Sequence, residues 1–97
     1  MQLGEKLVRD EEAADARKML VGVAKLNAQY ATAQQEAIAS EADLDAMREK
    51  YAEDMAGVRA QATTRHGGDT FDYQEAVSSR EFDVRSVQIK SQRAGAQ

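Results

Sequence analysis

The stretch from Glu5 to Arg65 contains no residue pattern that would break a helix decisively. It has no proline and only two glycines, Gly22 and Gly57, and it is rich in Ala, Glu, Lys, Arg, Gln and Met. These residues have high helix propensities, whereas Gly and Pro are the ones that interrupt helices. The sequence therefore predicts an all-α fold built around a long amphipathic, coiled-coil-like helical segment over residues 1–66.

From Tyr30 to Ala62, apolar and small residues recur at alternating steps of three and four. Such spacing is typical of a coiled-coil seam, and one 4-4 step near Met55 departs from the heptad. A dense apolar cluster, Met19–Leu26, precedes the seam. We expect these positions to carry association between helices, with the contact residues Leu20, Val23, Leu26, Tyr30, Ala37, Leu44, Met47, Tyr51, Met55 and Val58.

The segment can be one helix or a helical hairpin with a break near residues 39–40. Ser40-Glu41-Ala42-Asp43 fits the Ser-x-x-Asp form of a helix start. A hairpin turn normally contains Gly, Pro or Asn, and none is present here. We favour the continuous helix on that ground.

His66-Gly67-Gly68-Asp69-Thr70 is the strongest interruption in the chain. Paired glycines end helices, and Asp69 or Thr70 can cap a following one. We expect a Gly-rich turn at 67–70, a short C-terminal helix at 71–93 and a flexible tail at 94–97, although residues 82–89 also alternate as strands do. Apolar residues of this last block predict a second anchoring patch of Phe71, Tyr73, Val77, Phe82 and Val84.

The apolar content suggests a core that needs a partner. Hydrophobic residues make up 42% of the chain, but 18 of them are alanine. An alanine buries little more than one methyl group, and small domains bury a low fraction of their surface. We expect the chain to associate as a homo-oligomer or with other assembly proteins.

Little in the sequence points to catalysis or to a cofactor. His66 is the only histidine, and beside two glycines it is better explained as a cap at the end of the long helix. Asp45, Glu49 and Glu53 share a helix face but lack the spacing of a calcium loop and the Glu-x-x-His of a bundle metal site. With no cysteine, thiolate sites are excluded as well. We expect no enzyme activity, no metal and no cofactor.

Charge and hydropathy limit the possible partners. The net charge is −4, while the last fourteen residues carry Arg85, Lys90 and Arg93 and no acid. An acidic chain is poorly suited to duplex DNA, so contact with nucleic acid is expected only through this basic tail. No signal peptide and no segment long enough to span a membrane is recognisable, so we expect a chain that is not secreted by a signal peptide.

The C-terminal half combines an Ala-rich helix over 55–62, a Gly turn at 66–69, Ala76, the Glu81-Phe82-Asp83-Val84 step and Val87. In this combination it resembles the small internal virion (ejection) proteins of short-tailed phages. The resemblance implies a helical protein carried inside the capsid near the portal, so we expect the virion or the cytoplasm of the producing cell as the location. This chain opens with Leu3-Gly4-Glu5-Lys6, whereas the family often opens with an apolar segment suited to membranes.

Together these features predict a non-enzymatic structural protein that acts by helix–helix association, as an internal or portal-associated component of a phage particle. The alternative is a small acidic inhibitor or adaptor that docks on one protein. Acidic side chains on such a module could mimic nucleic acid in a basic groove.

Overall fold

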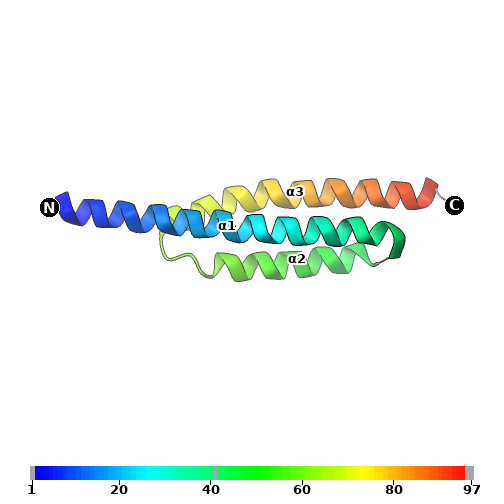
Figure 1. Cartoon of the computed structure of the whole chain (residues 1–97), viewed down its shortest axis with the longest axis horizontal. Helices are drawn as coiled ribbons and strands as arrows, with labels where there is room; N and C mark the ends of the chain where they lie inside the picture. Colours follow the sequence, from blue (N-terminus) through cyan, green and yellow to red (C-terminus); the bar gives the residue numbers. More distant parts are fainter. Residues whose placement is uncertain (1, 41, 96–97) are drawn as a thin grey trace.

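The computed structural model describes residues 2–40 and 42–95 of the chain. These residues form three helices, α1 (Gln2–Ser40), α2 (Leu44–Arg59) and α3 (Arg65–Gly95), and contain no strand. The prediction of an all-α fold is therefore confirmed, and residues 82–89 are helical. The helices pack side by side into a narrow bundle of 67 × 17 × 15 Å. In this bundle α1 and α3 run in the same direction, and α2 runs in the opposite direction from the end of α1 toward the start of α3 (Figure 1).

The connection between α1 and α2 shows that the continuous helix was the wrong alternative and that the chain forms a hairpin here. The helix start comes three residues later than Ser40, because Asp43 is the N-cap of α2. Its Oδ1 accepts hydrogen bonds from the backbone N–H groups of Asp45 and Ala46, both at 3.0 Å. An N-cap carboxylate satisfies amides that have no partner in the first turn, so the chain can reverse here without Gly or Pro.

The glycine-rich segment corrects a second prediction. Gly67 and Gly68 lie inside α3, which begins at Arg65, so there is no turn at 67–70. His66 is an exposed residue in the first turn of α3 and cannot cap an earlier helix. The C-terminal helix is 31 residues long rather than short, and it includes Ala94 and Gly95 of the expected tail; residues 96 and 97 lie outside the described part of the chain.

The start of α3 is capped from two directions. Thr64 precedes the helix, and its Oγ1 accepts a hydrogen bond of 2.9 Å from the Gly67 N–H. The carboxylate of Asp15, in α1, accepts from the N–H groups of Thr63 and Thr64 at 3.0 and 2.8 Å and from Thr64 Oγ1 at 2.7 Å. A Cβ on residue 67 would lie 1.9 Å from Asp15 Oδ2, so only glycine fits beside this carboxylate. Gly67 is therefore explained by close approach of α1, not by a turn.

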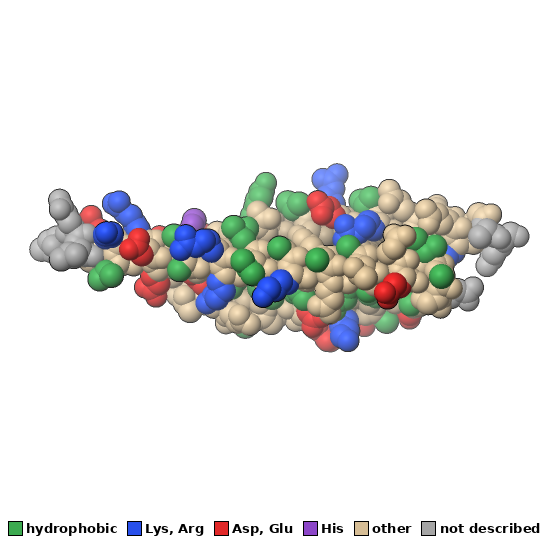
Figure 2. All heavy atoms as spheres, in the orientation of Figure 1, with side chains coloured by type: hydrophobic (Ala, Val, Ile, Leu, Met, Phe, Trp, Pro, Cys, Tyr) green, Lys and Arg blue, Asp and Glu red, His purple; other side chains and the backbone are tan. Residues whose placement is uncertain are grey.

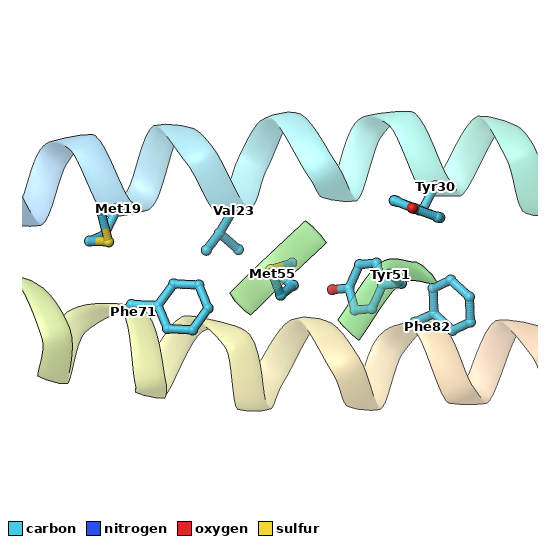
Figure 3. Packing of buried hydrophobic residues seen from close by; sticks show 7 residues of the cluster. All are labelled: Met19, Val23, Tyr30, Tyr51, Met55, Phe71 and Phe82. Atoms are coloured by element: carbon cyan, nitrogen blue, oxygen red, sulfur yellow. The ribbon is translucent and has the colours of Figure 1, made fainter. Parts of the chain in front are cut away.

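The core lies between the three described helices and is built from a few large side chains (Figure 3). Met19, Val23 and Tyr30 of α1 point toward Phe71 and Phe82 of α3. Tyr51 and Met55 of α2 complete the cluster. The three aromatic rings pack closely, since the Tyr51 and Phe82 centroids are 4.8 Å apart and stacked, and the Tyr30 and Tyr51 rings meet edge to face at 5.1 Å.

Buried polar groups fix how α1 lies against α3. Gln34, 1% exposed, donates to the Phe82 carbonyl at 2.9 Å and to Ser86 Oγ at 3.0 Å, and it accepts from Arg85 Nε at 2.8 Å. Two turns earlier Asn27 donates to Ser78 Oγ at 2.7 Å. Because a buried polar group that loses its partner costs stability, these bonds favour one register between the helices.

Candidate helix-docking face

α3 presents two different faces. The inward face carries Phe71, Ser78, Phe82, Ser86 and Ile89, all of them buried. Its serines are small, so the backbones of α1 and α3 can approach closely. Both other described helices lie on this side of α3 (Figure 1), which leaves the opposite side uncovered.

The uncovered side is an apolar stripe, which we call the outer face of α3 and define by Tyr73, Val77, Val84 and Val87. These four residues are 68, 41, 49 and 66% exposed, respectively. They follow one another, with Arg80 in the middle, at steps of four and three, the spacing of a coiled-coil seam. Hydrophobic side chains stand along this edge of the molecule in Figure 2, with charged groups between them.

Two shallow hollows lie on either side of the ridge formed by Arg80 and Val84. One is lined also by Ala76, Asp83 and Val87, and the other by Val77 and Glu81. Side chains of a docked helix fit into such hollows between successive turns, in the manner of knobs in holes. The outer face is thus shaped as well as apolar.

Charged side chains flank the stripe. Asp83 accepts a hydrogen bond of 2.9 Å from Arg48 Nε, and the Arg48 guanidinium lies 5.9 Å from the Phe82 ring centroid. Within the described residues, Arg80 and Glu81 form no ion pair. An arginine in the middle of an apolar stripe therefore remains available to a carboxylate of a docked partner.

The structure divides the residues predicted to associate into three groups. Eight are buried in the chain's own core: Val23, Tyr30, Ala37, Leu44, Tyr51, Met55, Phe71 and Phe82. Three are partly buried against that core: Leu26, Met47 and Val58. Four are exposed: Leu20, Tyr73, Val77 and Val84.

These three groups show that the periodicity of the seam comes mainly from packing within one chain. The seam from Tyr30 to Val58 passes through the break between α1 and α2, so its residues pack against one another within one chain. The second patch does not lie on one surface, because Phe71 and Phe82 point inward while Tyr73, Val77 and Val84 point outward. Val87 was missing from the predicted contact residues, although its three-residue step from Val84 was the signal that could have included it.

The ionisable groups with shifted pKa values lie in the packing between helices. The hydrogen bonds from Thr64 hold the pKa of Asp15 far below its usual range, against the opposing effect of burial. Burial, together with a hydrogen bond of 2.5 Å to Asp54, raises the pKa of Tyr30 to about 12. Burial also raises the pKa of Tyr51. Their partners are packing neighbours, so we interpret these shifts as consequences of the fold.

The described residues offer neither a metal site nor a membrane-spanning helix. Among the described residues no group of three or more His, Cys, Asp or Glu side chains could hold a metal ion. None of the three described helices is both long enough and apolar enough to cross a membrane.

The described residues therefore form a small helical bundle in which α3 has an uncovered apolar face. The sequence matches no known family model, no curated protein and no solved structure.

Proposed function

We propose that this chain is a non-enzymatic structural protein that assembles through the outer face of α3. The observation that carries the proposal is the regular spacing of Tyr73, Val77, Val84 and Val87 on a helix side that no other described helix covers. Isolated exposed apolar residues are normal on protein surfaces and need no explanation. A set that repeats at coiled-coil spacing over four helical turns is the pattern that a helical partner buries.

The core described above supports this placement of the contact. Tyr30, Tyr51 and Phe82 are 4% exposed or less, so the large side chains of the seam are already used within the chain. An association that needed them would first have to open the bundle. The outer face of α3 can be buried without any such change.

For the setting, we propose an internal or portal-associated position in a phage particle. Only the sequence resemblance supports this part of the proposal. Its glycines lie in a helix here and not in a turn. The features that remain are the Ala-rich helix, which ends at Arg59, and Ala76, the step from Glu81 to Val84 and Val87. Portal or tail genes beside the coding gene would support the setting, and a neighbourhood without any particle gene would count against it.

Light scattering over a concentration series tests the assembly. The wild-type chain should form an oligomer of defined mass, and Val77→Glu combined with Val87→Glu should remove it. Ala52→Glu combined with Ala56→Glu is the matched control, because both residues are exposed on α2 and the change in charge is the same. Circular dichroism of each variant shows whether the bundle is intact. A wild-type chain that stays monomeric at high concentration would refute self-assembly and favour the small acidic binding module.

A further inference from the structure

We infer that the outer face of α3 is covered by the same face of a second copy, with the two α3 helices antiparallel and a two-fold axis beside residue 82. The inference rests on the proposed function and adds the partner, the direction and the register. The order of residues along the stripe, Tyr73, Val77, Arg80, Val84 and Val87, carries it.

The position of Arg80 decides the direction. In a parallel, in-register pair each residue of a seam faces its own copy. Arg80 would then face Arg80 of the second copy in the middle of an apolar contact, and like charges so placed destabilise an interface. An antiparallel pair avoids this, because each residue then faces a different residue of the other chain.

The pairing of residues between the two stripes decides the register. With the two-fold axis beside residue 82, Val77 faces Val87 of the second copy, and Arg80 faces Val84. Tyr73 lies opposite Ser91, so all four apolar residues are covered over about 27 Å of helix, at 1.5 Å per residue. A shift of the second helix by one heptad in one direction pairs Val84 with Val87 but places Arg80 opposite Ser91, with no carboxylate of the second copy within one turn, and a shift in the other direction places Val87 opposite Thr70.

Charge complementarity supports the same register. Glu81 and Asp83 of the second copy fall beside the seam within one turn of Arg80. Arg80 and Glu81 form no ion pair within the described part of the chain, and Asp83 is 58% exposed at its side chain despite its bond to Arg48. Each Arg80 thus gains carboxylates from the other copy, and by symmetry the same contacts form twice.

Two substitutions to the same residue type distinguish this arrangement from others. Val77→Glu places a carboxylate against Val87 of the second copy, twice in each dimer. Each uncompensated charge should raise the dissociation constant by about tenfold or more, and each dimer contains two such charges. The dissociation constant should therefore rise by about 100-fold or more. Val84→Glu places the carboxylate against Arg80 of the second copy, and the dissociation constant should stay within about tenfold of the wild type because an ion pair replaces the apolar contact. Sedimentation equilibrium measures both values.

Cross-linking gives an independent measurement, since the chain contains no cysteine of its own. Val77→Cys combined with Val87→Cys should be joined into covalent dimers by a short bismaleimide. Val77→Cys alone should not, because the two copies of residue 77 would be about 15 Å apart along the axis. In a parallel pair the single variant would cross-link. Thermal melts establish that each variant is folded before its association is compared.

Each outcome has a distinct meaning. Retention of the dimer by Val84→Glu, its loss with Val77→Glu and cross-linking of only the double variant would support the inference. If both glutamate variants raised the dissociation constant equally and Val77→Cys alone were cross-linked, the antiparallel register would be overturned. The proposed function would still stand. A monomeric wild type, or a dimer that neither glutamate affects, would overturn both.

Discussion

Replacing Gly67 by alanine puts a methyl group where the carboxylate of Asp15 already lies. The new Cβ would be 1.9 Å from Oδ2 and 2.4 Å from Cγ of Asp15, far inside any normal contact distance. The Asp15 side chain is 1% exposed and is held by Thr63 and Thr64, so it has little room to turn away. The substitution therefore forces α1 and the start of α3 apart or breaks the cap.

The expected cost combines two opposing effects. Overpacking of this kind costs roughly 1–3 kcal/mol, and so deep an overlap belongs at the upper end. Alanine is the better helix former by about 1 kcal/mol. The net loss in the free energy of unfolding should be about 2 kcal/mol, which lowers the melting temperature of a chain of this size by about 8–16 °C.

The neighbouring glycine supplies the control. A Cβ on residue 68 would lie 2.9–3.0 Å from the guanidinium of Arg59, whose side chain is 47% exposed and can swing into solvent. Gly68→Ala should give up an exposed ion pair of Arg59 with Asp72 and gain helix propensity, so its stability should stay within about 1 kcal/mol of the wild type. Circular dichroism at 222 nm during thermal and urea unfolding measures both variants. A Gly67→Ala chain as stable as the Gly68→Ala chain would refute the close approach of Asp15.

Four further predictions test other contacts. Gly22→Ala should destabilise the bundle, because its Cβ would lie 2.7 Å from Val58 Cγ1, and Val58→Ala should restore part of the loss in urea melts. Because the pKa of Asp15 is lower in the folded state, its contribution to the free energy of unfolding is complete above the unfolded pKa of about 4 and is lost as the pH falls below that value. In Asp15→Asn the free energy of unfolding should therefore fall less steeply with pH in that range. Tyr30, with its pKa raised to about 12, contributes fully to the free energy of unfolding below about pH 10 and loses that contribution between pH 10 and 12. Tyr30→Phe should remove this loss of stability at alkaline pH. Gln34→Leu should cost about 1–3 kcal/mol in denaturant unfolding, because it leaves buried groups of α3 without their partner; an unchanged midpoint would contradict it.

Local properties of the sequence predicted the class of fold well. The helix formers gave an all-α chain, and the steps of three and four selected Tyr30, Ala37, Leu44, Tyr51 and Met55, all of which are buried. Periodicity reports which side of a helix is covered, but it does not say whether the cover comes from the same chain. The same positions therefore looked like an interface and proved to be an internal core.

The errors arose where a distant residue decides the local structure. Gly67 and Gly68 have the composition of a turn, yet they are helical because Asp15, more than fifty positions earlier, lies against the first of them. The reversal of the chain after Ser40 was the less favoured prediction because no Gly, Pro or Asn marks it. The Asp43 N-cap is sufficient to start α2 there. On α3 the spacing identified Tyr73, Val77 and Val84, but only the position of α1 shows that they face outward.

The carboxylate of Asp15 also bears on the order in which the chain folds. α1 and α2 are joined by a short connection, so they can meet after a small loop closes, whereas the partners of Asp15 are 48 and 49 residues away. The backbone amides of Thr63 and Thr64, which immediately precede α3, find this partner only after α1 has reached them. We expect the α1–α2 hairpin to form first and the start of α3 to dock last, so that loss of Asp15 speeds unfolding and leaves the folding rate almost unchanged.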